Sequence, residues 1–175
     1  MRKWITQQKA KGLKMTMQGI QAVYLPEHNE EPRILFSPAD VDDMIDTLLM
    51  SDGSGDSVEM FSLDRPRVGP LNMPDHRLFA GVRRDRNAGV LDSGDGTCEI
   101  PDTRSASEDV RVSASAVTFA TATEGDVVVY SQNGSPFEFL ISSEISIGKV
   151  REAVKGFVAM GGKRPSCVEW VDAGY

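Results

Sequence analysis

Residues 37–50 read SPADVDDMIDTLLM, and this stretch predicts the best-defined element of the fold, an α-helix. Ser37 is a typical N-cap, Pro38 fits the first turn, and Asp40 favours both the cap and the helix dipole. The apolar residues recur at helical spacing on one face: Val41, Met44, Ile45, Leu48 and Leu49. Three aspartates fall largely outside that stripe: Asp42, Asp43 and Asp46. We therefore expect the solvent side of this helix to be acidic.

The segments on either side of the helix predict strands. Mixed apolar and polar residues indicate strands over Gln18–Leu25, Arg33–Phe36 and Val58–Leu63, with a polar turn over Pro26–Pro32 between the first two. The stretch Arg65–Asp75 contains three prolines and a glycine, which favours a loop.

Further along the chain, the pattern predicts two hairpins and a second helix. One hairpin joins Arg77–Val82 to Ala88–Asp92, and the other joins Val127–Ser131 to Phe137–Ile141 through Asn133-Gly134, a strong turn signal. Between the hairpins we expect a polar loop over Ser93–Asp109, a short strand around Cys98–Ile100, and a strand over Val110–Thr121. The second helix spans about Ser146–Met160 and ends at Gly161-Gly162, and a short strand follows around Val168–Trp170.

These elements predict an α+β fold in a single domain. Short turns between neighbouring strands favour a mostly antiparallel sheet of about six or seven strands, with the two helices packed on one face. We expect residues 18–175 to form this domain and residues 1–17 to form a basic, flexible N-terminal tail.

Composition indicates an acidic globular protein that works in a reducing compartment. The net charge is −7, and because residues 1–14 carry five basic and no acidic side chains, the rest of the chain has a net charge of −12. Such a body repels nucleic acid and membrane surfaces and attracts basic partners. The two cysteines do not form a disulfide framework, and no apolar segment is long enough to span a membrane. We expect a cytoplasmic protein.

The sequence offers little that is typical of catalysis. Its two histidines, His28 and His76, lie far apart in loop-like segments without further ligands at metal-binding spacing. The stretch Asp52–Leu63 resembles a calcium loop only superficially, because Ser57 replaces the turn glycine and Leu63 the final glutamate. We therefore predict no catalytic residues, no metal site and no cofactor.

The last third of the chain carries a set of motifs. They are Phe137-Glu138-Phe139, the helix with Val154 and Phe157, Gly161-Gly162-Lys163-Arg164-Pro165, and Val168-Glu169-Trp170. Together they resemble the C-terminal signature of immunity protein family one, whose members accompany polymorphic bacterial toxins. We interpret the motif residues Phe157, Gly162, Arg164, Pro165 and Trp170 as structural, because glycine caps the helix and tryptophan fills core volume.

The resemblance implies a non-catalytic inhibitor that binds its cognate toxin in a one-to-one complex and occludes the active site. It further implies similarity to the immunity partners of nucleic-acid deaminases, including a double-stranded-DNA cytosine deaminase; a nuclease toxin is a second possibility. An acidic surface would complement the basic groove of such an enzyme.

The candidate contact residues are acids that we expect outside the core. They are Asp42, Asp46, Asp52 and Asp56 around the first helix, and Asp92, Asp95, Asp102 and Asp109 in the long polar loop. Two other readings stay open: an interaction module that has no toxin partner, and an enzyme with a pocket that brings His28 or His76 near acids. Neither nucleic acid nor a membrane is expected as a direct partner.

Overall fold

The computed structural model describes residues 19–51, 55–94, 98–101 and 127–172 of the chain. The main sheet follows the order β10-β9-β3-β6-β7-β8-β12, and β1, β2 and β11 are attached to it at the sides. Its strands are β1 (Ile20–Val23), β2 (Arg33–Leu35), β3 (Asp56–Ser62), β6 (Arg77–Arg83), β7 (Ala88–Gly94), β8 (Cys98–Pro101), β9 (Val127–Gln132), β10 (Ser135–Leu140), β11 (Ile145–Ser146) and β12 (Trp170–Asp172). All pairings in it are antiparallel except one parallel bridge between Asp56 of β3 and Ser131 of β9.

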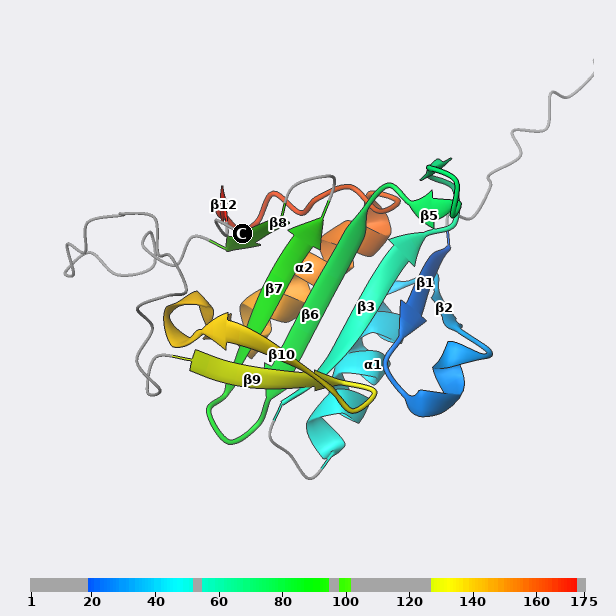
Figure 1. Ribbon diagram of the computed structural model, residues 1–175. Coiled ribbons are helices and arrows are strands. Elements are labelled where there is room, and N and C mark those ends of the chain that lie inside the picture. Colours follow the sequence, from blue (N-terminus) through cyan, green and yellow to red (C-terminus); the bar gives the residue numbers. More distant parts are fainter. Residues whose placement is uncertain (1–18, 52–54, 95–97, 102–126, 173–175) are drawn as a thin grey trace, which may run out of the picture.

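Two helices, α1 (Pro38–Met50) and α2 (Ile147–Ala159), lie side by side on one face of this sheet (Figure 1). Their apolar stripes and the facing strand residues form the larger core, which includes Val41 and Ile45 of α1, Val154 and Phe157 of α2, and Leu78 of β6. The prediction of an α+β fold with two helices against a mostly antiparallel sheet is confirmed.

The predicted start of α1 is also confirmed at the level of single hydrogen bonds. The Ser37 hydroxyl accepts from the backbone N–H of Asp40 (3.2 Å), while the Asp40 carboxylate accepts from the backbone N–H of Ser37 (2.9 Å). This reciprocal capping box satisfies two groups that have no partner inside the helix.

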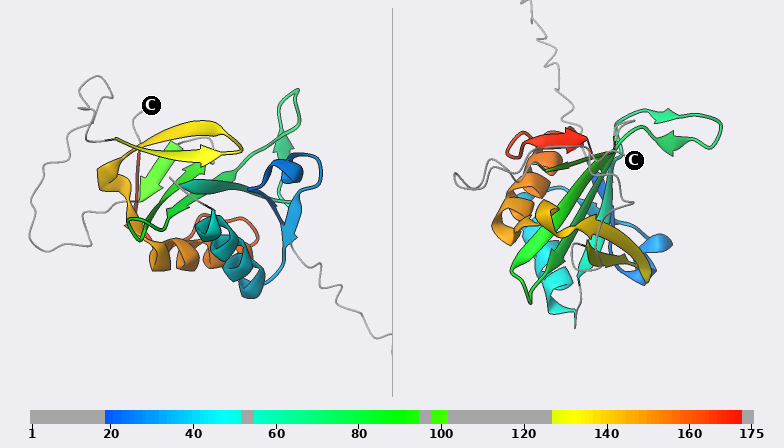
Figure 2. Two further views of the ribbon diagram at one scale, coloured as in Figure 1. Left: turned by 90° about the horizontal axis from the view of Figure 1, so that it is seen from below. Right: turned by 60° about the vertical axis from the view of Figure 1, so that its left-hand side comes forward.

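The opposite face of the sheet is covered in part by the β9–β10 hairpin, which crosses in front of β6 and β7 (Figures 1 and 2). A second, smaller core fills the space between them: Phe79, Val90, Val128, Tyr130 and Phe139. The predicted Asn133-Gly134 turn is confirmed, because both residues adopt positive φ (50° and 83°), the conformation that a tight two-residue hairpin needs. The molecule is thus three layers thick where this hairpin lies.

Two predictions need correction. The stretch Arg65–Asp75, predicted as a loop, contains a short hairpin of β4 (Arg67–Val68) and β5 (Met73–Pro74). Asp92 lies in a strand, β7, as the predicted hairpin requires, but its side chain is 8% exposed, so its placement among the exposed loop acids is wrong. The strand predicted over Val110–Thr121 lies outside the described residues.

Candidate functional site

His76, one of the two histidines considered for catalysis, is buried directly before β6. Its Nε2 accepts a hydrogen bond from the backbone N–H of Ser62 (2.6 Å), and its Nδ1 lies 2.7 Å from a carboxylate oxygen of Asp75. Because a backbone N–H can only donate, Nε2 has no proton, and the neutral ring donates from Nδ1 to Asp75. Burial lowers the pKa of His76, although the hydrogen bond to Asp75 acts in the opposite direction. Both ring nitrogens are therefore occupied, and the ring is unsuited to acid–base catalysis.

The same contacts connect three segments of the chain. We call the residues involved the His76 junction: Ser62, Arg65, Asp75, His76 and Gly162. The Arg65 guanidinium donates to the carbonyl oxygen of Gly162 (2.9 Å) and contacts Asp75 (3.4 Å). The histidine and then Arg65 hold the pKa of Asp75 below its usual value. The junction connects the end of β3, the base of the β4–β5 hairpin and the segment after α2.

His28 lies in a short 3₁₀ helix (Pro26–Asn29), with its ring 4.3 Å from that of Tyr24 in an edge-on arrangement. Its Nδ1 is buried without a hydrogen-bond partner. Within the described residues no group of three or more side chains is placed to hold a metal ion. Within the same residues, no helix is long and apolar enough to cross a membrane.

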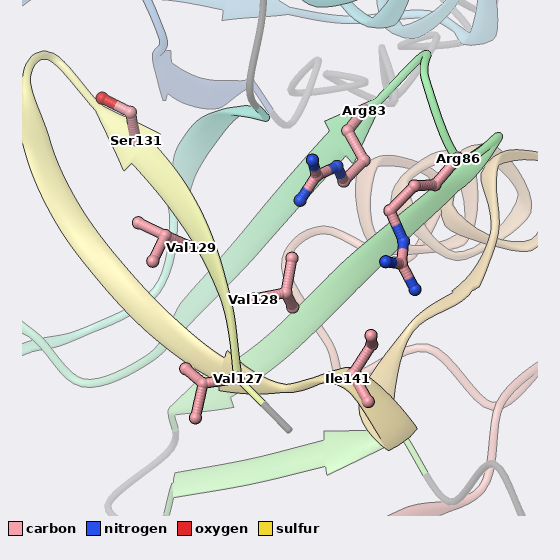
Figure 3. A pocket seen from close by; sticks show the side chains of 7 residues that line it. All are labelled: Arg83, Arg86, Val127, Val128, Val129, Ser131 and Ile141. Atoms are coloured by element: carbon pink, nitrogen blue, oxygen red, sulfur yellow. The ribbon is translucent and has the colours of Figure 1, made fainter. Parts of the chain in front are cut away.

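A groove of about 360 Å³ opens between β9 and the β6–β7 turn (Figure 3). Two guanidinium groups and a run of valines line it: Arg83, Arg86, Val127, Val128, Val129, Ser131 and Ile141. Both cations already have carboxylate partners, since Arg83 makes two 2.8 Å hydrogen bonds to Asp85 and Arg86 lies 2.9 Å from Glu144. Among its described lining residues, the groove therefore combines apolar walls with cations that are paired to carboxylates.

Glu144 also accepts a hydrogen bond from the Tyr130 hydroxyl (2.9 Å) beneath the β9–β10 hairpin. Burial first, and then this carboxylate, raises the pKa of Tyr130. A phenol whose ionisation is suppressed in this way serves as a hydrogen-bond donor that fixes the hairpin, rather than as a base.

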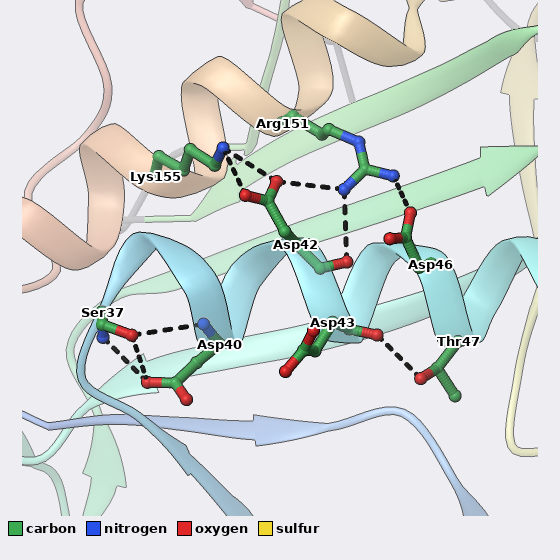
Figure 4. Close-up of polar contacts among 8 residues, drawn as sticks. All are labelled: Ser37, Asp40, Asp42, Asp43, Asp46, Thr47, Arg151 and Lys155. Atoms are coloured by element: carbon green, nitrogen blue, oxygen red, sulfur yellow. Dashed lines mark hydrogen bonds and ion pairs between the residues drawn. The ribbon is translucent and has the colours of Figure 1, made fainter.

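Two of the three acids predicted on the solvent side of α1, Asp42 and Asp46, face the cations of α2 (Figure 4). Asp42 contacts both Lys155 (2.8 Å) and Arg151 (3.1 Å), and Asp46 pairs with Arg151. The hydrogen bond from Lys155, followed by that from Arg151, holds the pKa of Asp42 below its usual value. We call these four residues the helix seam, and its charges largely compensate one another.

The remaining candidate acids are scattered. Asp56 is half-buried at the start of β3, where it pairs with Val82 of β6. Asp92 forms an ion pair with Arg77 on the neighbouring strand, so this acid is occupied inside the protein. The four others, Asp52, Asp95, Asp102 and Asp109, lie outside the described residues.

The structure also reveals an acidic surface that sequence reasoning missed. We call it the acidic corner: Glu27, Glu30, Glu31 and Asp43, all exposed. Asp43 and Glu27 both lie near Tyr24, whose pKa is raised first by burial and then by these charges. Among the ion pairs and side-chain hydrogen bonds of the described residues, none uses these four carboxylates. The signal in the sequence was three glutamates within five residues without an intervening cation.

The C-terminal motif residues lie in α2, in the segment that follows it and in β12. Phe157 is buried in the larger core, and Gly162, which belongs to the His76 junction, adopts φ +85°. Trp170 is half-buried, and its Nε1 donates to the carbonyl oxygen of the buried Pro165 (2.8 Å). The Arg164 guanidinium lies 6.0 Å from the Trp170 ring centroid, at the limit of a cation–π contact.

The described residues thus combine a charge-paired helix seam, an exposed acidic corner and a buried His76 with both ring nitrogens hydrogen-bonded. The family model for immunity protein Imm1 matches residues 29–172 of the chain. The chain belongs to the Imm1 family. It is an immunity protein of a polymorphic toxin system, and such proteins bind their cognate toxins, typically without enzymatic activity. Among the described elements, the Imm1 match includes both helices and every strand from β2 to β12. No curated protein matches the chain.

Proposed function

We propose that this Imm1 protein neutralises a nucleic-acid-modifying toxin, in particular a cytosine deaminase acting on DNA, by covering its active site in the cytoplasm of the producing cell. The family match carries the immunity function. The choice of a nucleic-acid enzyme rests on charge, since the chain beyond residue 14 has a net charge of −12. Enzymes that bind DNA or RNA carry basic grooves, which an acidic inhibitor complements in both association rate and specificity.

The acidic corner supports this proposal more directly than the composition does. Its carboxylates are exposed and unpaired among the described residues, so their field acts outward on an approaching cation. The helix seam, in contrast, faces its own cations. We therefore add Glu27, Glu30, Glu31 and Asp43 to the toxin-facing candidates Asp42, Asp46, Asp52, Asp56, Asp95, Asp102 and Asp109.

The test of the function is coexpression with the toxin domain encoded by the neighbouring gene. We expect a one-to-one complex and restored growth of cells that the toxin alone would arrest. DNA from cells that carry the toxin without this chain then separates the two toxin classes. C-to-T changes in the genome sequence indicate a deaminase, and strand breaks in the isolated DNA indicate a nuclease. A neighbouring domain that neither binds nor kills would contradict the immunity proposal and favour an interaction module without a toxin.

The test of the acidic corner is kinetic. Replacing Glu27, Glu30 and Glu31 by glutamine should slow association with the toxin and flatten its dependence on salt, while the dissociation rate changes little. The matched control replaces three exposed glutamates elsewhere, Glu138, Glu152 and Glu169, which removes the same total charge. Equal effects in both variants would reduce the role of the corner to net charge alone.

We further propose that residues 18–175 suffice for binding and that residues 1–17 are an accessory tail. The family match, which begins at residue 29, supports this division. A chain shortened by residues 1–17 should bind the toxin with unchanged affinity in calorimetry, and a clear loss of affinity would assign a role to the tail.

A further inference from the structure

The β4–β5 hairpin projects from the body of the molecule at one end of the sheet (Figure 2). It carries large apolar side chains that are well exposed: Val68 (52%), Leu71 (81%) and Met73 (57%). The described part of the chain has eight exposed large apolar residues, and three of them lie within residues 68–73. Such a concentration of apolar surface on a protruding element is typical of an interaction site.

The hairpin is held in place from its base to its tip. At the base, the His76 junction fixes Asp75 and Arg65, and the backbone N–H of Asp75 donates to the carbonyl oxygen of Pro66 (3.3 Å). At the tip, the N–H of Asn72 donates to the carbonyl oxygen of Gly69 (3.1 Å), which closes a turn. A buried junction that supports an exposed apolar tip gives the tip a defined direction before any partner arrives, and such preorganisation lowers the entropic cost of binding.

We infer that the tip of the β4–β5 hairpin inserts into a concave apolar pocket on the toxin and anchors the complex. This inference rests on the proposed immunity function and adds to it an anchoring contact on the toxin side. Interface energy is typically concentrated in a few apolar side chains that fill pockets, surrounded by polar contacts that exclude water. Leu71 and Met73 have the size and exposure of such anchors, and the acidic corner supplies charges for long-range attraction.

A toxin pocket suits this tip better than a second copy of the chain. A stable interface needs roughly 800 Å² and 20–30 residues from each partner, which two short hairpin tips cannot supply to one another. Two copies would also repel, because each has a net charge of −7. Between Pro66 and Pro74 the single charged side chain is Arg67, so the tip can leave water without burying any of the chain's numerous carboxylates.

The experiment replaces Leu71 and Met73 together by alanine. Binding to the toxin domain encoded by the neighbouring gene is then measured by calorimetry and by surface plasmon resonance. We expect Kd to rise at least thirtyfold, chiefly through faster dissociation, with unchanged thermal unfolding. The matched control is Met50→Ala, because Met50 at the end of α1 is also 81% exposed. A Leu71→Met variant keeps an apolar side chain and should retain most of the affinity.

The outcomes separate the two proposals. If the unaltered chain fails to bind the toxin, the immunity proposal itself fails. If it binds but the double variant binds within twofold, or if Met50→Ala weakens binding equally, the hairpin inference is wrong. A dimer of the unaltered chain in sedimentation that the double variant dissociates would reassign the tip to self-association. A photo-crosslinking amino acid at position 71 provides a readout independent of stability, and it should crosslink to the toxin whereas one at position 50 should not.

Discussion

The β4–β5 hairpin and the helix seam use their surface residues in opposite ways. In the seam, Asp42 and Asp46 of α1 are matched by Arg151 and Lys155 of α2, so an acidic stretch of sequence becomes a nearly neutral surface. In the hairpin, Leu71 and its neighbours remain exposed although the base is firmly anchored. The comparison teaches that side chains satisfied within the protein have little to offer a partner, whereas exposed groups on a rigid support remain available for binding.

The largest expected effect is at the base of the hairpin. A Cβ added at Gly162 would lie 2.5 Å from the Cβ of Ser62 and 3.1 Å from Nε2 of His76, and the residue has φ +85°. Gly162→Ala therefore combines backbone strain with a steric clash in a buried junction, and we expect the free energy of unfolding to fall by about 3 kcal/mol. Urea denaturation monitored by tryptophan fluorescence would measure this loss.

Gly134 is the control for this prediction. It has nearly the same φ (+83°), but a Cβ there would meet nothing within 4 Å. Gly134→Ala should therefore show the backbone strain alone, about 1 kcal/mol. Equal losses in the two variants would mean that the junction can move aside, and the base of the hairpin would then be less rigid than we infer.

The second effect is the pH dependence of the same junction. Burial lowers the pKa of His76 in the folded chain from the ordinary value of 6.5, so the unfolded chain binds a proton more readily. This contribution to stability is complete above pH 6.5 and is lost as the pH falls below it, by at most about 1.4 kcal/mol per pH unit. Asp75, whose pKa is also lowered, adds a loss only at more acidic pH, below its ordinary value of 3.8.

Comparing unfolding curves at pH 7.5, 6.5 and 5.5 would reveal this slope. His76→Gln removes the titrating ring while keeping polar atoms near Ser62 and Asp75, so the slope between these pH values should shrink even though the variant is less stable throughout. An unchanged slope would assign the pH dependence to other groups and would remove His76 as its source.

Local patterns predicted most of the secondary structure of this chain. The α1 cap, the apolar stripe and the Asn133-Gly134 turn each depend on residues within a few positions of one another, and the structure confirms all three. The β4–β5 hairpin was missed because three prolines in the stretch Arg65–Asp75 favour a loop, and because its strands contain two residues each. A strand that short has no periodicity to detect.

The candidate site was less predictable because its properties depend on distant partners. Asp42 and its partner Arg151 are 109 positions apart, and nothing in the neighbourhood of either residue indicates the pairing. Asp92 ends the predicted strand Ala88–Asp92 and was also counted among the exposed acids of the following loop, but it pairs with Arg77 within the sheet. Solvent exposure of a carboxylate is a tertiary property, so sequence alone could not separate the acidic corner from the seam.

The third effect concerns the helix that carries the acidic half of the seam. Ser37→Ala removes the hydroxyl that accepts from the N–H of Asp40, and we expect a loss of about 1 kcal/mol in the free energy of unfolding. Thr47→Ala on the same helix is the control, because Thr47 is exposed and lies away from the cap. A loss at Thr47 as large as that at Ser37 would indicate a general effect on α1 instead of a capping effect.

The smallest effect is expected from the seam itself. Arg151→Met removes the contacts to both Asp42 and Asp46 but keeps most of the side-chain stem. Exposed ion pairs contribute little to stability because water and salt screen them, so the loss should be smaller than that of Ser37→Ala and should disappear in 1 M salt.

The same variant sharpens the comparison between the two regions, because it leaves Asp46 without its cation and makes the surface more acidic. If the seam of the complete protein fails to attract the toxin only because its charges are paired, Arg151→Met should associate faster with a basic toxin at low salt. The gain in rate should then vanish at high salt. Stopped-flow association measured at several salt concentrations would show this difference. An unchanged rate would place the seam away from the toxin and leave the acidic corner as the better candidate for steering.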